Sequence, residues 1–394
     1  MPLPLYLLAM AVFAMGTSEF MLAGLLPDIA SDLGVTVGTA GGLTSAFAIG
    51  MVVGAPLVAA LSRTWPRRAG LLGFTAVFAA AHAVGAVTTS FPVLFVTRVV
   101  AALANAGFLG FALTAAATLV PPDKKGRALA VLLSGTTVAT IIGVPGGSVL
   151  GTVLGWRATF WAVAVLCLPA VLGILKGFPS RSVLDLPEAT GGPALRAELA
   201  QLARVRLLLV MLLGALVNAA TFGSFTYLAP VVTDTAGLGE LWVPVVLVLF
   251  GAGSSVGVTV AGRLSDRRPC QVVAVAGPLL VVGWPALAVL ADQPVALCLL
   301  GFVLGALSFA LGSTLITRVL YEAAGAPTMA GSYATAALNV GAAVGPLIAA
   351  TTLGTAAGNL GPLWTSGLLA AMTLVIAFSS RALRMALVGP GGRS

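Results

Sequence analysis

The stretch LYLLAMAVFAMGTSEFMLAGLL, residues 5–26, decides the fold of this chain. An apolar run of about 20 residues is long enough to cross the ~30 Å hydrocarbon core of a bilayer as a helix. One carboxylate, Glu19, lies inside this run. Burying a charge in hydrocarbon is costly, so Glu19 must be paired, hydrated or reversibly protonated. Each of these states is typical of a transport pathway.

The rest of the sequence has the same apolar character. Of its 394 residues, 59% are hydrophobic and only 8% are charged, and the mean hydropathy is +1.08. No soluble core needs that much apolar surface, so the composition predicts an all-α membrane protein. Twelve apolar runs are centred near Met15, Met51, Phe78, Asn105, Ala139, Val165, Val217, Ser254, Leu279, Ser308, Leu338 and Met372.

Basic residues alternate between the connections of the predicted spans. The net charge of +8 would also fit a nucleic-acid binder, but this placement indicates membrane topology instead and excludes nucleic acid as a partner. The positive-inside rule predicts a multi-pass protein of the cytoplasmic membrane with both termini in the cytoplasm. Arg157 and the acids Asp28, Asp32, Asp234, Glu240 and Asp292 fall on the external side. The cytoplasmic connections carry Arg63, Arg67, Arg68, Lys124, Lys125, Arg127, Lys176, Arg181, Arg196, Arg204, Arg206, Arg263, Arg267, Arg268, Arg318, Arg381, Arg384 and Arg393.

An internal repeat underlies the hydropathy pattern. Three pairs of marker residues share nearly one offset: Glu19 with Asn218 (199), Arg67-Arg68 with Arg267-Arg268 (200), and Pro145 with Pro346 (201). We therefore predict a six-helix half over 1–176, a cytoplasmic linker over 177–206 and a second six-helix half over 207–394. Two parallel six-helix halves around a midplane cavity are the architecture of alternating-access transporters.

The predicted linker contains an amphipathic segment. Leu195, Leu199 and Leu202 share a helical stripe between arginines. This pattern predicts a short helix lying on the cytoplasmic membrane surface.

The fifth span contains closely spaced glycines and a proline. Gly143-Val144-Pro145-Gly146-Gly147 is followed by Gly151 and by Gly155-Trp156-Arg157-Ala158-Thr159-Phe160. Small residues let helix backbones approach, and Pro145 removes a hydrogen bond, so the two halves could seal and pivot here. The alternative is a packing seam with no role in export. The stretch resembles the antiporter motif of the twelve-helix drug:proton antiporters in the major facilitator superfamily.

The connection after the eighth span also resembles a motif of this superfamily. Gly262-Arg263-Leu264-Ser265-Asp266-Arg267 is similar to the cytoplasmic gating motif, which implies that Asp266 and Arg267 bridge neighbouring helices. The alternative is a set of solvated loop charges. The equivalent stretch of the first half departs from the motif, because Ala59 and Arg63 hold its Gly and Asp positions.

The first span resembles the start of the chloramphenicol efflux proteins, through Gly16-Thr17-Ser18-Glu19-Phe20 and Leu26-Pro27-Asp28. In a continuous helix, Asp28 would lie about 13 Å beyond Glu19 and half a turn round. Glu19 is therefore the better candidate for the proton carrier, with a structural partner role as its alternative. Asp28 is a second candidate for proton coupling or else a carboxylate at a helix end.

Arg98 is the basic residue inside a predicted span. Its depth below the external surface, counted from Pro92, matches that of Glu19. The resemblance implies that the first and fourth spans face each other, so we expect a Glu19 to Arg98 interaction. A guanidinium favours the charged carboxylate and burial favours the neutral one, so conformational change could load and release a proton. His82, in the third span, is read as a packing residue with one hydrogen bond, with pH sensing as the alternative.

Five further polar residues are candidates for the substrate cavity, with helix packing as the alternative for each: Asn105, Asn218, Tyr227, Tyr333 and Asn339. They suit a mostly apolar drug with few hydrogen-bonding groups.

The combined interpretation is a membrane exporter, not an enzyme, that exchanges chloramphenicol or a similar small amphiphile for protons. A phosphate-cradling Gly-Lys-Ser/Thr loop is missing from the sequence, which argues against ATP drive by this chain. We expect a monomer in the lipid bilayer with no cofactor and no metal. A transporter of sugars or other metabolites with the same fold is the alternative.

Overall fold

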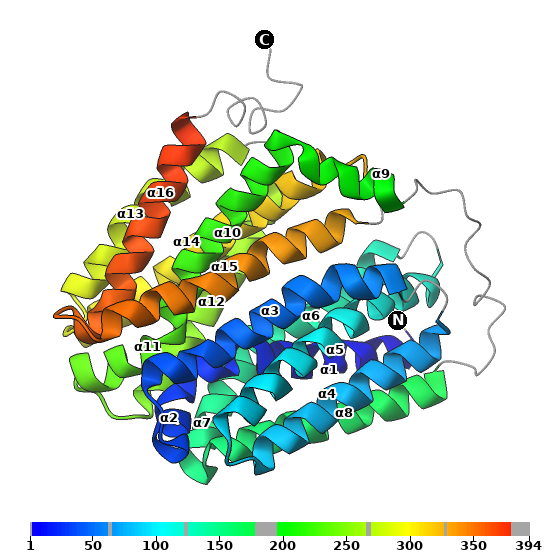
Figure 1. Cartoon of the computed structure of the whole chain (residues 1–394), viewed down its shortest axis with the longest axis horizontal. Helices are drawn as coiled ribbons and strands as arrows, with labels where there is room; N and C mark the ends of the chain where they lie inside the picture. Colours follow the sequence, from blue (N-terminus) through cyan, green and yellow to red (C-terminus); the bar gives the residue numbers. More distant parts are fainter. Residues whose placement is uncertain are drawn as a thin grey trace.

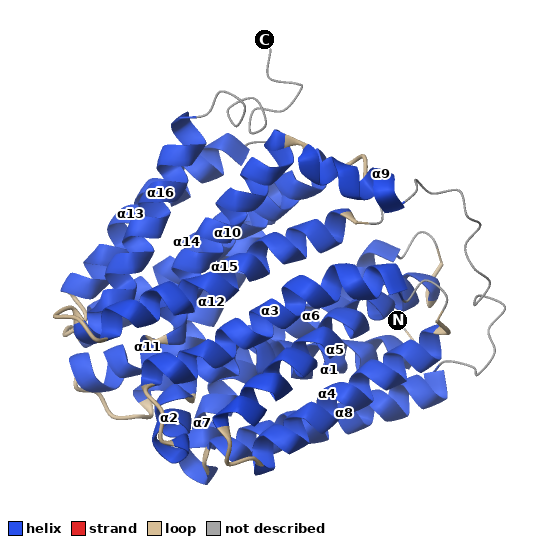
Figure 2. Cartoon of the chain, in the orientation of Figure 1, coloured by secondary structure: helices blue, strands red, loops and turns tan. Residues whose placement is uncertain are grey.

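The chain folds entirely into helices within the residues that the structure describes. The computed structural model describes residues 2–61, 65–121, 125–177, 195–264, 269–326 and 329–379, and no strand occurs in these ranges (Figure 2). A helix bonds its own backbone groups, which is why apolar runs of this length form helices in a bilayer.

Twelve helical spans in the described ranges are long and apolar enough to cross a membrane, and each contains one of the predicted centres, so the predicted fold class is confirmed. The spans are α1 (Leu3–Phe20) with the 3-10 turn η1 (Met21–Gly24), α3 (Val37–Leu61), α4 (Arg67–Val87), α5 (Phe91–Thr118), α6 (Lys125–Val138) with η4 (Ala139–Gly143) and α7 (Val144–Leu154), α8 (Trp156–Gly177), α10 (Val205–Thr226), α12 (Trp242–Leu264), α13 (Pro269–Val289), α14 (Pro294–Glu322), α15 (Ala330–Leu353), and α16 (Gly361–Ser379) preceded by η8 (Gly358–Leu360).

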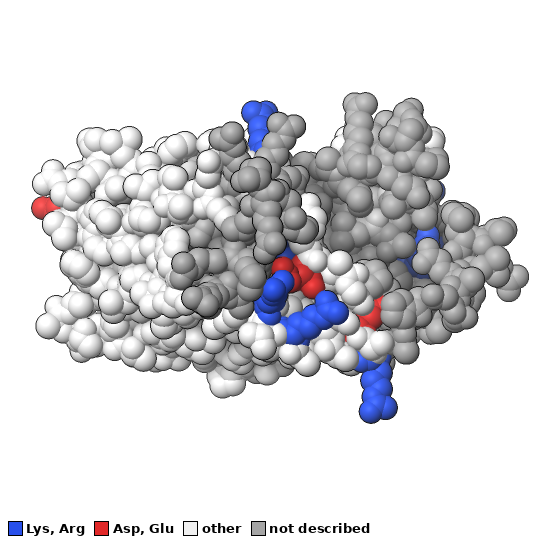
Figure 3. All heavy atoms as spheres, turned by 90° about the horizontal axis from the view of Figure 1, so that it is seen from above, with Lys and Arg blue, Asp and Glu red and all other residues white. Residues whose placement is uncertain are grey.

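Short elements mark the two ends of the bundle. α2 (Leu26–Leu33), α11 (Leu228–Pro230) and η7 (Val231–Thr235) lie at one end, which we call the α2 end (Figure 1). α9 (Leu195–Leu199) and η6 (Ala200–Ala203) lie at the other, the α9 end. Figure 3 shows one face of the molecule, where lysine and arginine side chains gather in the middle and to the right while the left part is almost uncharged.

Two apolar cores hold the bundle together. One is built mainly from the first six spans and the other mainly from the last six. Each core contains a pair of helices in backbone contact through glycines. A Cβ at Gly50 of α3 would overlap Val99 O of α5, and a Cβ at Gly253 of α12 would overlap Phe302 O of α14. The same close approach thus recurs in both sets of six spans.

Contacts between the first six and the last six spans extend from the α2 end to the middle of the spans. A Cβ at Gly38 of α3 would touch the Ala350 side chain of α15, and one at Gly251 of α12 would overlap Thr140 O of η4. α3 and α15 lie side by side (Figure 1), as do α7 and α12.

The segment around α9 contains the short helix predicted there, and the contact that attaches it is made by Glu198. Leu199 is 44% exposed, whereas Glu198 is fully buried. The Glu198 carboxylate accepts the Met329 backbone N–H at 2.9 Å, and the Tyr333 hydroxyl donates to Glu198 O at 2.8 Å. A carboxylate satisfies the unpaired N–H groups at a helix start, so Glu198 attaches α9 to the beginning of α15.

Candidate functional site

The first span breaks one residue after Glu19, where α1 ends. α1 ends at Phe20, η1 continues as a 3-10 turn, and α2 is a separate helix with Pro27 in its first turn. Proline lacks the N–H that a continuous helix would need, so a new helix begins here. The continuous helix assumed from the sequence is therefore wrong. Glu19 lies in the last turn of α1 and is partly exposed, whereas its neighbour Ser18 is fully buried.

Ser18 joins two basic side chains from neighbouring helices. Arg98 of α5 donates from Nη1 to Ser18 Oγ at 2.7 Å and from Nη2 to Ser18 O at 2.8 Å. His82 of α4 lies with Nε2 2.7 Å from Ser18 Oγ and with Nδ1 2.8 Å from Phe78 O. The Arg98 guanidinium also lies 4.5 Å from the centre of the Phe47 ring.

Glu19 and Arg98 lie close enough for their charges to interact, but they do not form an ion pair in this arrangement. Among the described residues, the Glu19 carboxylate has no ion pair and no hydrogen bond. The depth in the membrane that the sequence predicts for Arg98 is nevertheless right. Arg98 lies beside the turn of α1 that carries Glu19, because its partner Ser18 is the residue before Glu19. His82 packs by two hydrogen bonds, one more than expected.

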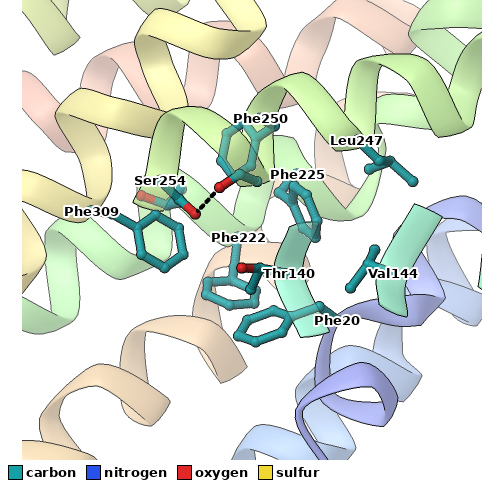
Figure 4. A pocket seen from close by; sticks show the side chains of 11 residues that line it. Phe20, Thr140, Val144, Phe222, Phe225, Leu247, Phe250, Ser254 and Phe309 are labelled. Carbon is teal, nitrogen blue, oxygen red and sulfur yellow. Dashed lines mark hydrogen bonds between the residues drawn. The ribbon is translucent and has the colours of Figure 1, made fainter. Parts of the chain in front are cut away.

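A pocket lies between the first six and the last six spans. Phe20, the residue after Glu19, is part of its wall. The pocket is narrow and is partly open to its surroundings. Figure 4 shows phenylalanine rings around it. Phe20 stacks on Phe222 with ring centres 5.7 Å apart, and Phe225 lies 4.8 Å from Phe250. The lining residues are Phe20, Thr140, Val144, Thr221, Phe222, Phe225, Leu247, Phe250, Gly251, Ser254 and Phe309.

The pocket is uncharged, and its polar groups are hydroxyls. Ser254 donates to Gly251 O at 2.7 Å, Thr221 to Val217 O at 2.8 Å, and Thr140 to Thr137 O at 2.9 Å. Each hydroxyl hydrogen is thus used within its own helix, and each oxygen keeps lone pairs. The pocket can therefore bind a mostly apolar aromatic molecule with a few hydrogen-bond donors.

The five polar residues predicted for the substrate cavity make hydrogen bonds to neighbouring helices or within their own helix. Asn105 Nδ2 donates to Met51 Sδ, Asn218 Nδ2 to Leu338 O at 2.7 Å, and Asn339 Nδ2 to Thr335 O of its own helix. Tyr227 bonds to Pro346 O at 3.0 Å, and Tyr333 holds α9. None of the five lines the pocket described above, and their place in a substrate cavity stays a prediction.

The glycine motif of the fifth span packs mostly inside the first six spans. A Cβ at Gly143 would overlap Thr17 of α1, and one at Gly147 would lie 3.0 Å from Thr159 Cγ2 of α8. Gly146 faces open space. The turn before Pro145 is a π-helix, Ala139–Gly143, a form often found at functional sites. Contact with the last six spans comes instead from Thr140 and Val144.

The gating motif is described only in part. Gly262 is exposed near the end of α12, and a Cβ there would meet no atom within 4 Å. Asp266 and Arg267 lie outside the described residues, as does Arg63 in the first-half stretch.

Asp28, the second proton-coupling candidate, is separate from Glu19. It is exposed on α2, at the α2 end. Partial burial, and then the negative charge of Glu240, raise the pKa of Asp28 above its ordinary value.

Sequence reasoning missed the phenylalanine pocket and the Ser18 contacts. One signal was available for the pocket. The repeat offset of about 200 that pairs Glu19 with Asn218 also brings Phe20 close to Phe222, and these two rings stack. Ser18 and His82 carry no comparable pattern.

Comparisons with known proteins agree with this architecture. Residues 8–346 match the model of the Major Facilitator Superfamily. The chain is 80% identical over 381 residues to the chloramphenicol resistance protein of Streptomyces lividans, covering 97% of each chain. It is 34% identical to the inner membrane transport protein YdhP of Escherichia coli K12, over 87% of this chain and 86% of that one. The crystal structure of the nucleoside transporter NupG (D323A mutant) has the same fold, with a TM-score of 0.76 at 14% identity over 97% of this chain and 99% of that one.

Proposed function

This chain belongs to the major facilitator superfamily of membrane transporters, and we propose that it exports chloramphenicol or a similar small amphiphilic drug in exchange for protons. It is a multi-pass membrane transporter. The Streptomyces relative is named for chloramphenicol resistance and matches nearly the whole chain, and this similarity supports the choice of drug.

The observation that carries the proposal is the uncharged, phenylalanine-lined pocket between the two sets of six spans. Chloramphenicol is an uncharged nitroaromatic that carries hydroxyl and amide groups. Its ring would stack among Phe20, Phe222 and Phe250, and its polar groups would donate to the pocket hydroxyls. A sugar would leave many hydroxyls without partners against these rings, so the pocket favours a drug over a sugar.

Glu19 is the proposed proton carrier. It is partly exposed at the break of the first span, and the next residue, Phe20, lines the pocket. A movement that carries drug past Phe20 would therefore also change the surroundings of the carboxyl group. Proton binding from one side and release to the other would then follow the drug cycle.

We further propose that the α9 end faces the cytoplasm and that the protein lies in the cytoplasmic membrane as a monomer. Described basic residues near the α9 end, such as Arg67, Arg196 and Arg206, support this orientation. The two apolar cores support movement of residues 1–176 and 207–394 as halves joined by the 177–206 linker.

Replacing Glu19 with Gln should abolish drug-driven proton movement while the protein still folds, since the amide cannot exchange a proton. Everted vesicles loaded with a pH-sensitive dye would report proton release when chloramphenicol is added. Asp292→Asn is the matched control, because it makes the same chemical change at an exposed loop position.

The proposed exchange also sets the size of the drug gradient. One neutral drug exchanged for one proton would hold a roughly 40- to 50-fold drug gradient per 100 mV of proton-motive force, since moving one charge across 100 mV is worth about 2.3 kcal/mol.

Proton release by Glu19→Gln at the wild-type rate would rule out Glu19 as the carrier. Release driven by sugars but not by chloramphenicol in the wild-type protein would replace the drug with a metabolite as substrate.

A further inference from the structure

Three buried side chains next to Glu19 form a cluster that the transport scheme does not yet use. Ser18, His82 and Arg98, from α1, α4 and α5, are each at most 1% exposed. We call them the Ser18 cluster. Polar groups are rarely collected in a membrane span without a function, because each costs free energy to bury.

For a neutral His82, the hydrogen bonds of the Ser18 cluster have one consistent direction. Phe78 O can only accept, so the hydrogen of the neutral imidazole lies on Nδ1 of His82. Nε2 is then an acceptor, and the Ser18 hydroxyl donates to it. The Ser18 oxygen in turn accepts the Nη1–H of Arg98. His82 therefore sets the orientation of the hydroxyl that holds Arg98.

Arg98 is incompletely satisfied by these partners. Its Nε is buried without a hydrogen-bond partner among the described residues, and its other partners are a hydroxyl and a carbonyl. A carboxylate is a stronger partner for a guanidinium than either of these. Glu19 is the residue next to Ser18, so a short movement of Arg98 would exchange Ser18 for the Glu19 carboxylate.

We propose that His82 is a positioning residue for proton exchange, which orients Ser18 so that Ser18 holds Arg98 away from Glu19 while Glu19 carries the proton. When Glu19 releases its proton to water, the carboxylate takes Arg98 from Ser18. When a proton returns, Arg98 goes back to Ser18. Only the proton moves between the carboxyl group and water, and His82 stays neutral throughout. This inference rests on the proposed function.

The charges around His82 support its neutral role. Arg98 on α5 is the charged group that acts on His82 within the described residues, and Glu19 on α1 follows their shared partner Ser18 in the chain. The neighbouring helix α8 contributes the Phe160 ring at 5.7 Å, and α4 itself contributes the Phe78 ring at 4.3 Å. A second positive charge on the imidazole would repel Arg98 across one hydroxyl group.

The test measures chloramphenicol-driven proton movement across a pH series, with the full-length protein in proteoliposomes. His82→Ala frees the Ser18 hydroxyl, so Arg98 pairs more readily with Glu19 and holds it charged. The pH profile of proton movement should then shift to lower pH by about one unit. This is the smallest shift that a neighbouring opposite charge usually causes in a carboxyl pKa. Chloramphenicol exchange without a proton gradient should stay at the wild-type rate.

Two further variants separate positioning from proton carriage. His82→Gln keeps an uncharged acceptor near the place of Nε2 and should restore the wild-type profile. Ser18→Ala removes the hydroxyl and should shift the profile in the same direction as His82→Ala. Thr75→Ala is the matched control, since Thr75 lies on the same buried face of α4 and its hydroxyl bonds only to Leu71 O of that helix.

An unshifted profile in both His82→Ala and Ser18→Ala, with drug exchange intact, would overturn the inference. Loss of coupling in His82→Gln with intact drug exchange would also overturn it, by making His82 the proton carrier. If the wild-type protein moves no protons when chloramphenicol is added, the proposed function itself fails.

Discussion

Asp28 and Asp32 lie one turn apart on α2, yet Asp32 is next to a positive charge and Asp28 is near a negative one. Asp32 forms an ion pair with Arg157 and accepts the Trp156 indole N–H at 3.2 Å. Asp28 meets the negative charge of Glu240 instead, and its pKa is raised by partial burial and by this charge. A raised carboxyl pKa means that the folded arrangement favours the protonated form. The associated stability is present in acid and is lost as the pH rises through the raised pKa.

Asp28→Asn should therefore raise the unfolding temperature of the purified protein at neutral pH. The amide resembles the protonated carboxyl group and keeps the stability that the charged form loses. Because Asp28 is exposed, solvent screening limits the gain to less than about 1 kcal/mol. Thermal unfolding in detergent would measure this gain, once at neutral pH and once at a pH below the ordinary pKa of a carboxyl group. The gain should disappear in acid.

Asp32→Asn is the control on the same helix, and it should lower the unfolding temperature at neutral pH because it breaks the ion pair. A loss of stability in both variants would show that Glu240 does not act on Asp28.

At the scale of the element, α10 and α15 meet backbone to backbone. A Cβ at Gly341 would overlap Ala215 O, and one at Gly345 would overlap Ala219 O. Neither carbonyl can move without moving α10. The same contact allows Asn218 to reach Leu338 O.

Gly341→Ala should destabilise the protein by about 1 to 3 kcal/mol, the usual cost of overpacking, because the two helices must separate. Gly331→Ala makes the same change on the same helix, at a position where a Cβ meets nothing within 4 Å. The control should be neutral or slightly stabilising, since alanine is the better helix former. Denaturation in a mild detergent compares the two variants. Equal stability would contradict the close packing.

The sequence predicts elements better than contacts. Hydropathy locates all twelve spans because a lipid-facing helix must be apolar over its whole length. The break after Phe20 has a sequence signal in Pro27, which starts a new helix, whereas hydropathy gives no signal for the π-helix before Pro145. Arg98 and Glu19 stand out as charges, but the hydroxyl of Ser18 looks like any other serine until the fold brings His82 and Arg98 to it.

At the scale of the whole molecule, Tyr227 connects the last six spans to the first six. Its hydroxyl lies 3.0 Å from Pro346 O of α15 and 3.4 Å from Gly38 O of α3. A Cβ at Gly41 of α3 would overlap this hydroxyl. The tyrosine therefore needs glycine at 41 for the two sets of spans to meet at the α2 end.

Gly41→Ala should favour conformations in which the α2 end is open. A loss of about 1 kcal/mol at this contact would shift the populations roughly fivefold. Spin labels at Thr39 and Thr351, both exposed near the α2 end, would report longer distances by pulsed electron resonance in a background without the native cysteines. Gly42→Ala is the control, because a Cβ at Gly42 meets nothing within 4 Å. Identical distance distributions in the two variants would show that Tyr227 does not hold this junction.

The contact between Glu198 and Met329 also has a consequence for biosynthesis. The two residues are 131 positions apart in the chain. At about 5 to 20 residues per second, the ribosome needs roughly 7 to 26 s to make the stretch between them. During that interval the Glu198 carboxylate has no N-terminus of α15 to bind and must remain hydrated. The connection at α9 is therefore completed only after the eleventh span has begun, which makes the burial of Glu198 a late step of membrane insertion.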